Sequence, residues 1–305
     1  MPKIGFNLAL EHTQNTHSLG IRWWQIVNPA IYLISILPAL VVLLLAGESS
    51  VWLPGLIVSV LAVVILQHAI NLFNDVSDWD RGADVEKLDS WVRLFDGDTR
   101  QVQIQAVISF IAGGIIGLSV LFVGDQLWIV AIAFPLIILG YLYNAGKSPL
   151  SYTWMGEWVT GICYAGVFGG LWLVAGLALN LIALMGAIAI AALAMSLLLS
   201  HQSPQLETDR NAGKRSFCVR YGRQTTKQVS VCLCILSLVL INLGIVINSS
   251  QPTLHYAVFF LIAWFSGYLV KVGPNPKKIL IISSALLLVM ALLSLLAQYE
   301  QVIIQ

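Results

Sequence analysis

The chain has 305 residues, of which 58% are hydrophobic and only 10% are charged, and its mean hydropathy is +0.84. A soluble domain carries roughly 25% charged residues, so this composition excludes an ordinary water-soluble protein and favours lipid as the solvent. The net charge of +1 offers no basic surplus for a nucleic-acid partner.

Nine stretches of the chain are long and apolar enough to cross a membrane. A spanning helix needs about 20 largely apolar residues, because every backbone polar group must be hydrogen-bonded within the lipid. We therefore predict an all-α polytopic membrane protein with nine transmembrane helices around a central cavity, forming a single transmembrane domain over residues 1–305. The predicted spans are approximately 24–46, 52–76, 103–123, 126–143, 156–177, 180–200, 229–248, 254–271 and 279–298.

The basic residues test this division into spans. All 16 Lys and Arg residues fall in the N-terminal segment, in the loops after the second, fourth and sixth spans, or at the end of the eighth span and just after it. Basic residues stay on the cytoplasmic side of a membrane protein. The pattern therefore predicts a cytoplasmic N-terminus and, with nine spans, an external C-terminus.

The end of the second predicted span carries a run of amides and carboxylates. Polar groups inside a membrane are costly and face a cavity or a partner, and clustered carboxylates repel one another unless a cation neutralises them. Hard oxygen ligands suit Mg²⁺, which binds one or two carboxylates together with substrate phosphates. A solvated acidic loop paired with Arg81 and Arg93 is the alternative, but it does not require polar residues two turns inside the helix. Residues on one helical stripe here are His68, Asn71, Asp75 and Asp78, and an overlapping stripe holds Gln67, Asn71, Asn74 and Asp78.

A second polar segment follows the sixth predicted span, from His201 to Arg215. It combines the carboxylates of Glu207 and Asp209 with a Gly-Lys-Arg cluster. Carboxylates hold a metal ion, whereas Lys and Arg meet phosphate oxygens directly. Alone, the segment is typical of a basic cytoplasmic loop. Two such loops on one membrane face favour a diphosphate site instead.

These segments resemble the motifs of the UbiA superfamily of intramembrane prenyltransferases. The run Asn74-Asp75-x-x-Asp78, followed by Arg81-Gly82-x-Asp84, is similar to the first aspartate motif of that superfamily. A later stretch is similar to the second aspartate motif of the superfamily: Glu207-x-Asp209-x-x-x-Gly213-Lys214-Arg215-Ser216. A third stretch is similar to the 1,4-dihydroxy-2-naphthoate prenyltransferase branch: Tyr143-x-x-Gly146-x-x-Pro149-Leu150-x-Tyr152-x-x-x-Gly156-Glu157.

The resemblance implies transfer of a prenyl group from an isoprenyl diphosphate to a small aromatic acceptor of naphthoate or quinone-precursor type. The resemblance also implies that Mg²⁺ is the cofactor and that diphosphate is the product released. It implies that the protein lies in the lipid of a bacterial cytoplasmic (inner) membrane. Implied catalytic residues are Asp78, Asp84 and Asp209. Implied metal ligands are Asn74, Asp75, Asp78, Asp84, Gln205, Glu207 and Asp209. Diphosphate would meet Arg81, Arg93, Lys147, Lys214 and Arg215, and the acceptor or prenyl group would meet His68, Asn71, Tyr143 and Glu157.

The chain departs from the superfamily pattern at Gln205, where an aspartate normally opens the second motif. Lys147 stands where the naphthoate branch usually has proline. The Pro- and Arg-containing stretch that usually follows the first motif is poorly matched in this chain, and Arg93 is the nearest candidate for its basic residue. His68 is either a hydrogen-bonded interior histidine or an acceptor-binding group, and Glu157 either orients the acceptor or caps its helix. Two other functions stay open: a UbiA-type enzyme that uses a non-aromatic acceptor or cyclises a terpene, and a catalytically silent membrane binding or transport protein.

Overall fold

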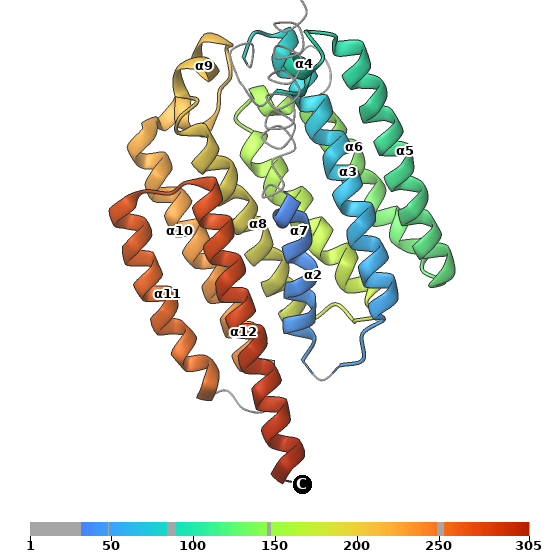
Figure 1. Cartoon of the computed structure of the whole chain (residues 1–305), viewed down its shortest axis with the longest axis vertical. Helices are drawn as coiled ribbons and strands as arrows, with labels where there is room; N and C mark the ends of the chain where they lie inside the picture. The colour runs from blue at the N-terminus through green and yellow to red at the C-terminus, as the bar shows by residue number, and fades with distance from the viewer. Residues whose placement is uncertain (1–31, 48, 84–89, 145–147, 249–252, 305) are drawn as a thin grey trace, which may run out of the picture.

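The computed structural model describes residues 32–304 apart from 48, 84–89, 145–147 and 249–252. Within these ranges the regular structure is helical throughout, which confirms the all-α prediction. The long helices run alongside one another, with the short helices α4 and α9 at one end and the C-terminus at the other (Figure 1). The elements are α2 Leu33–Ala46, α3 Leu53–Asp80, α4 Trp91–Leu94, α5 Thr99–Val123, η2 Leu127–Ile129, α6 Val130–Asn144, η3 Leu150–Tyr152, α7 Gly156–Val174, α8 Leu181–Gln202, α9 Leu206–Asn211, α10 Phe217–Asn248, α11 Thr253–Val272 and α12 Pro276–Ile304.

Eight helices in the described part of the chain are long and apolar enough to cross a membrane. They are α3, α5, α6 with η2, α7, α8, α10, α11 and α12, and they match the second to ninth predicted spans. The first predicted span, 24–46, lies partly outside the described residues. Its described helix α2 has 14 residues, which is shorter than the roughly 20 that cross a bilayer. A multi-pass membrane protein is therefore confirmed, and the count of nine spans stays a prediction.

Several helices extend beyond the apolar stretches that predicted them, and two of these, α3 and α10, do so into the polar segments. Helix α3 continues to Asp80 although the predicted span ends at 76, so Asp75 and Asp78 remain helical. Helix α10 begins at Phe217 rather than at 229, and Gly222 interrupts it with φ at 81°. That backbone conformation is open to glycine at little cost. The residues before Gly222 therefore form a lead-in that this kink separates from the helix of the apolar span.

Helix α2 packs against α3, α7, α8, α10 and α12. Leu45 of α2, Phe168 of α7 and Ile241 of α10 are fully buried in one apolar cluster. A methyl group on Gly186 would lie 2.2 Å from the Phe168 ring, so α8 can approach α7 only because position 186 lacks a side chain. Large apolar side chains on the outside, such as Phe260 at 79% exposed, face the surrounding lipid.

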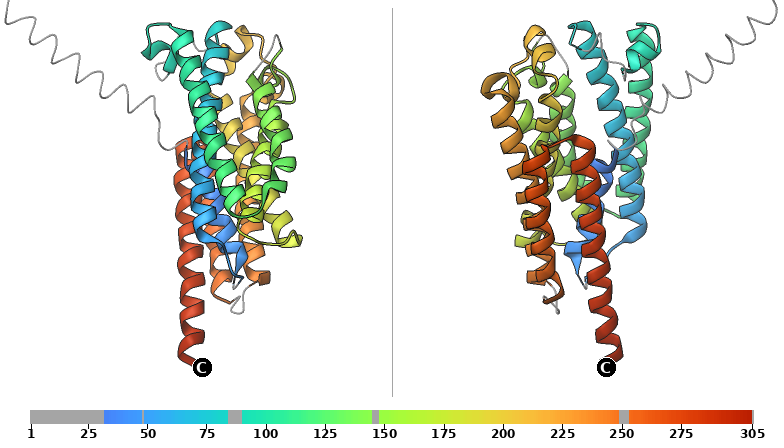
Figure 2. Two further views of the ribbon diagram at one scale, coloured as in Figure 1. Left: turned by 90° about the vertical axis from the view of Figure 1, so that its right-hand side faces the viewer. Right: turned by 60° about the vertical axis from the view of Figure 1, so that its left-hand side comes forward.

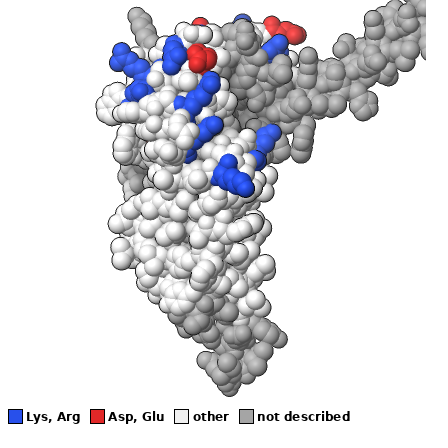
Figure 3. Space-filling model, turned by 90° about the vertical axis from the view of Figure 1, so that its left-hand side faces the viewer, with Lys and Arg blue, Asp and Glu red and all other residues white. Residues whose placement is uncertain are grey.

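The charged side chains gather towards one end of the molecule. Figure 3 shows Lys and Arg over the upper part of one face, while the described residues below them on that face show no charged side chains. Helix α12 runs away from this end, past the rest of the bundle, to the C-terminus in both views of Figure 2. From this asymmetry the positive-inside rule predicts that the basic end faces the cytoplasm.

The orientation can be tested with a reporter protein that is active only in the cytoplasm. Fused after Gln305, the reporter is expected to be silent, because α12 carries the chain away from the basic end. Fused after Gly273, between α11 and α12, it is expected to be active and serves as the control. Activity after Gln305 would show that one span has been miscounted.

Candidate functional site

Two segments that are far apart in the sequence meet at the basic end of the bundle, through Asp78 of α3 and the loop between α9 and α10. The Lys214 ammonium lies 3.0 Å from Asp78 Oδ2 and 3.7 Å from Asp209 Oδ1. Asp78 is 3% exposed and Asp209 is 4% exposed. Two buried carboxylates near each other require a cation. Lys214 supplies that positive charge, and it joins the two motifs across 136 residues of sequence.

Tyr152 of η3 is a further part of this centre. Its hydroxyl donates to Asp78 Oδ1 over 2.8 Å, and the Lys214 Nζ atom lies 4.9 Å from the centre of its ring. The Arg81 guanidinium carbon is 5.1 Å from the same ring centre, which is a cation–π distance. Sequence reasoning did not select Tyr152 as a site residue. The signal was its place in the stretch from Tyr143 to Glu157 that resembles the naphthoate branch, where the motif itself includes it.

The loop after α9 is folded so that Lys214 points inwards. Ser216 Oγ donates to Asp209 Oδ2 over 3.0 Å, and the Lys214 N–H donates to the Asp209 carbonyl over 2.9 Å. Gly213, with φ at 75°, makes the turn in the left-handed region that favours glycine. The backbone N–H of Arg215 donates to the Tyr152 carbonyl, while its side chain is exposed. Arg215 therefore lies beside the centre, with its charge directed outwards.

Asn74 lies one turn before Asp78 on α3, and its amide Nδ2 donates to Asp78 Oδ2 over 3.1 Å. Its amide oxygen brings a neutral oxygen ligand close to the Asp78 carboxylate. Asn74, Asp78 and Asp209 are thus the predicted metal ligands that the structure gathers around Lys214.

The Asp75 carboxylate has a different set of partners. Its Oδ2 atom accepts from Ser90 Oγ over 3.0 Å, from the Val92 N–H over 3.4 Å and from the Trp91 N–H. These groups form the N-terminal end of α4, whose first backbone N–H groups have no partner within the helix. In this structure Asp75 thus holds α4 against α3. Its role as a metal ligand stays a prediction.

Glu157 ties three helices together. Its side chain is 4% exposed. The Oε1 atom accepts from Gln202 Nε2 of α8 over 2.8 Å and from the Phe217 N–H of α10 over 2.7 Å. The Oε2 atom lies 3.2 Å from an Arg220 nitrogen. These contacts fix the start of α10 and hence the loop that carries Lys214. Glu157 thus caps α10 rather than its own helix, and its role in orienting the acceptor stays a prediction.

His68 is hydrogen-bonded within the bundle. Its Nδ1 atom lies 2.7 Å from the Tyr32 hydroxyl, and its ring meets the Trp91 ring edge at 5.4 Å between centroids. Ten residues of helix place it about 15 Å from Asp78 along α3. Asn71, half-buried, lies between them, and Tyr143 of α6 approaches Thr160 of α7 within hydrogen-bonding range. None of these residues contacts Lys214 in the described structure.

The hydrogen bonds and ion pairs described for Lys214 do not include three other predicted residues, although Gln205 lies one helical turn before Asp209. Glu207 points outwards, with its side chain 62% exposed, and pairs with Arg210 and Arg223 at 3.3 and 3.9 Å. Gln205 is half-buried at the N-terminus of α9, and its side chain does not cap that helix. Arg93 is exposed on α4. Asp84 and Lys147, which were predicted to bind metal and diphosphate, lie outside the described residues.

An apolar chamber of about 300 Å³ lies between α2, α3, α5, α6 and α7. It begins at Gln67 and Ile70, which are about 12–16 Å from Asp78 along α3. Gly170 lines it, and a methyl group added there would meet no atom within 4 Å. The chamber can hold a hydrocarbon chain out of water, close to the charged end of the bundle.

The donor set around Lys214 suits Mg²⁺ that is shared with a phosphate. Within the described ranges, no three or more His, Cys, Asp or Glu side chains converge as a metal-binding group. Mg²⁺ does not need such a cage, because it commonly takes one or two carboxylates, waters and substrate phosphate oxygens. The carboxylates of Asp78 and Asp209, with the amide oxygen of Asn74, meet that requirement. Lys214 adds a positive point charge, and lysine commonly binds phosphate in this way.

Comparison with known proteins places this arrangement in a family. The model of the UbiA prenyltransferase family matches residues 35–279. The 1,4-dihydroxy-2-naphthoate octaprenyltransferase of Bacillus subtilis is 26% identical over 214 residues, which are 68% of either chain. The 2-carboxy-1,4-naphthoquinone phytyltransferase of Synechocystis is 29% identical over 263 residues, which are 82% of either chain.

Solved structures share the fold. A UbiA homolog from Archaeoglobus fulgidus, bound to GPP and Mg²⁺, superposes with a TM-score of 0.63 at 15% identity and covers 90% of this chain and 99% of its own. The apo structure of a UbiA homolog from Aeropyrum pernix has a TM-score of 0.65 at 14% identity, with 89% and 98% covered. At these identities the likeness concerns the fold alone.

The structural role of Asp75 predicts a loss of stability. Asp75→Ala removes the acceptor of three buried donors, and a buried donor left without a partner costs about 1–3 kcal/mol. We expect a lower midpoint of thermal unfolding in detergent. Ser90→Ala removes one donor and leaves the carboxylate to the two backbone N–H groups, so its midpoint should fall less. An unchanged midpoint for Asp75→Ala, together with weaker divalent-cation binding, would show that Asp75 is a metal ligand instead.

Proposed function

Because the chain belongs to the UbiA prenyltransferase family, we propose that this membrane-embedded prenyltransferase transfers a prenyl group from an isoprenyl diphosphate to an aromatic acceptor of the naphthoate or quinone-precursor class. The observation that carries the proposal is the Lys214 bridge between two buried aspartates, one from each motif. Mg²⁺ is the proposed cofactor, and diphosphate is the proposed product. The relatives named as naphthoate and naphthoquinone prenyltransferases support the acceptor class.

The centre around Lys214 suits the departure of diphosphate. Negative charge grows on the diphosphate as its bond to the allylic carbon breaks, and groups placed beforehand to meet that charge lower the barrier. Mg²⁺ bound by Asn74, Asp78 and Asp209 would supply most of the positive charge. Lys214 would meet a phosphate oxygen directly, and the hydroxyl of Tyr152 holds the Asp78 carboxylate in place.

The rest of the reaction needs the exclusion of water. The allylic cation is attacked by a ring carbon of the acceptor, a carbon–carbon bond forms, and the acceptor then loses a proton to a base. Water would capture the cation first, so an apolar surrounding is needed. The apolar chamber that begins at Gln67 and Ile70 is suited to the prenyl chain.

The same proposal includes the setting of the enzyme. We infer a single transmembrane domain over residues 1–305, in a bacterial cytoplasmic membrane, with the reacting end on the cytoplasmic side. The gathering of Lys and Arg at the end that bears α4 and α9 supports that orientation. A diphosphate made in the cytoplasm would then reach Lys214 without crossing the membrane.

The function is tested by incubating purified protein with Mg²⁺, labelled prenyl diphosphates of several lengths and a panel of naphthoate, phenol and alcohol acceptors. Mass spectrometry should detect a prenylated aromatic product. Asp78→Ala is expected to lower turnover by about 10³-fold or more, because it removes a ligand that acts on the developing charge. Asp80→Ala, an exposed acidic neighbour, is the control and should retain activity. Full turnover in EDTA, or prenylation only of non-aromatic acceptors, would contradict the proposal.

Position 205 tests how the second motif holds its metal. The neutral amide of Gln205 leaves this motif one negative charge short of the usual superfamily pattern. Gln205→Asp is therefore expected to lower the Mg²⁺ concentration for half-maximal rate and to leave the product unchanged. A wild type that is inactive until the substitution is made would indicate a silent relative. Impaired activity at saturating Mg²⁺ would indicate that the glutamine contacts a substrate. An unchanged Mg²⁺ concentration for half-maximal rate would indicate that position 205 does not contact the metal.

A further inference from the structure

The Lys214 ammonium lies close to one oxygen of each buried carboxylate, and each carboxylate uses its other oxygen for a neutral hydroxyl. Asp78 Oδ1 accepts from the Tyr152 hydroxyl over 2.8 Å, and Asp209 Oδ2 accepts from Ser216 Oγ over 3.0 Å. The remaining oxygens, Asp78 Oδ2 and Asp209 Oδ1, are 3.0 and 3.7 Å from Lys214 Nζ. The two hydroxyls thus hold both carboxylates in an orientation that turns one oxygen of each towards the ammonium.

A metal ion bound by both carboxylates would need the same two oxygens. Mg²⁺ binds its oxygen ligands at about 2.1 Å, so it must come close to each of them. A divalent cation repels the ammonium at short range, and a lysine ammonium has no lone pair with which to ligate a metal. Lys214 must therefore leave Asp78 and Asp209 before one metal ion can be bound by both.

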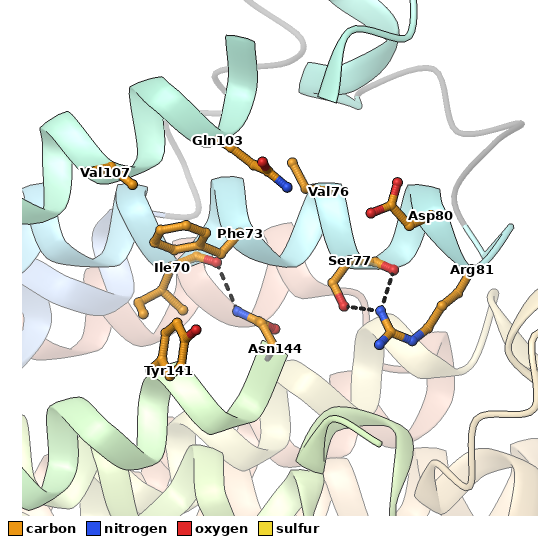
Figure 4. Close-up of a pocket in the computed structure, with 10 residues that line it drawn as sticks. All are labelled: Ile70, Phe73, Val76, Ser77, Asp80, Arg81, Gln103, Val107, Tyr141 and Asn144. Carbon is orange, nitrogen blue, oxygen red and sulfur yellow. Dashed lines mark hydrogen bonds between the residues drawn. The ribbon is translucent and has the colours of Figure 1, made fainter. Parts of the chain in front are cut away.

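Lys214 can exchange partners more readily than the other cation beside Tyr152. Arg81 Nη1 donates to the Ser77 carbonyl over 2.9 Å and to Ser77 Oγ over 2.6 Å, so Arg81 is tied to its own helix, as Figure 4 shows. Lys214 instead reaches α3 from the loop between α9 and α10, on a flexible four-carbon stem. Its Nζ atom lies 4.9 Å from the centre of the Tyr152 ring, beside which an ammonium is stabilised when it leaves a carboxylate.

Lys214 is also the most accessible of the three charged groups. Its side chain is 14% exposed, whereas those of Asp78 and Asp209 are 4% and 6% exposed. A diphosphate that approaches from solvent therefore meets the ammonium before it meets either carboxylate. Phosphate oxygens accept strong hydrogen bonds from an ammonium group, so a diphosphate can draw Lys214 away from the two aspartates.

We propose that Lys214 is a specificity-determining residue, which makes the centre take a divalent cation together with a diphosphate and reject the free ion. The inference rests on the proposed function, because Asp78 and Asp209 are ligands of the proposed Mg²⁺ site. Without a diphosphate, Lys214 occupies the two oxygens and the affinity for a free divalent cation is low. With a diphosphate, the ammonium bonds to phosphate oxygens, and both carboxylates become available to a metal ion.

The first test is the binding of Mn²⁺, used as the probe in place of Mg²⁺, to the full-length protein in detergent by equilibrium dialysis. In Lys214→Gln the carboxylates lose their ammonium, and Mn²⁺ alone is expected to bind about tenfold more tightly, or better, than to the wild type. Loss of a merely structural residue would not raise this affinity. Arg210→Gln is the matched control, because it removes one positive charge from a side chain of the same segment that is 56% exposed and paired with Glu207. Its affinity for Mn²⁺ should equal that of the wild type.

Two further variants show where the gain in affinity arises. Lys214→Gln combined with Asp78→Asn should lose the gain, because the ion then lacks one of its two carboxylates. Lys214→Arg keeps the positive charge and should bind Mn²⁺ alone as weakly as the wild type. If Lys214→Gln binds Mn²⁺ no more tightly than the wild type, or if Lys214→Arg shows the same gain, the proposal is overturned.

The wild type supplies a test that needs no variant. Inorganic diphosphate has no allylic group and cannot react, but it should increase the Mn²⁺ retained with the protein in the same dialysis. By linkage, Mn²⁺ should increase the retention of labelled diphosphate by the same factor. In Lys214→Gln both increases should be smaller. Equal retention of Mn²⁺ by the wild type with and without diphosphate would contradict the proposal.

Enzyme assays separate this inference from the proposed function. If the wild type prenylates no aromatic acceptor while Lys214→Gln binds Mn²⁺ more tightly, the proposed function is wrong and the role of Lys214 is supported. If the wild type transfers the prenyl group and Lys214→Gln binds Mn²⁺ no more tightly, the role of Lys214 alone is wrong.

Discussion

The ion pairs of Lys214 with Asp78 and Asp209 are the interactions on which the charged end of this molecule depends. Two carboxylates that are almost fully buried cannot share one small region without a cation. The neighbouring contacts keep that arrangement in place. Tyr152 holds Asp78, the turn at Gly213 directs Lys214 inwards, and Glu157 fixes the start of the helix that follows. The proposed reacting centre is therefore an assembly of helix ends rather than a feature of one helix.

The buried acids of this end divide into two kinds. Asp78 and Asp209 face each other across Lys214, whereas Asp75 and Glu157 satisfy backbone N–H groups at the starts of α4 and α10. Each carboxylate in the second pair completes a helix N-terminus, where unpaired N–H groups and the helix dipole favour negative charge. The second pair thus fixes the segments that flank the centre. In the proposed reaction only the first pair would act on the diphosphate, whereas loss of a member of the second pair would loosen the segments that flank the centre.

Much of the fold could be predicted from the sequence, because lipid imposes a length and a polarity on every span. The apolar stretches gave eight of the helices to within a few residues at most of their ends. The continuation of α3 to Asp80 and the early start of α10 at Phe217 could not be read from hydropathy, since polar helix outside the lipid has no apolar signature. The motif spacing drew attention to Asp78 and Asp209, which the structure brings together at Lys214. It could not separate Asp75 from Asp78, because both lie on one stripe of α3, and the partner of Asp75 comes from a later segment of the chain.

The charge of the centre suggests why cation and diphosphate would bind together. Asp78 and Asp209 carry two negative charges and Lys214 one positive charge, so the group has a net charge of −1. An aspartate at position 205, the usual residue in the superfamily, would add another negative charge, and Gln205 does not. A divalent cation then meets a site that Lys214 has already half neutralised, and its attraction to the protein alone is weakened. A diphosphate restores negative charge and offers Lys214 a second partner, so each ligand improves the site for the other. Replacing one carboxylate by an amide would thus move part of the metal's binding energy from the protein to the substrate.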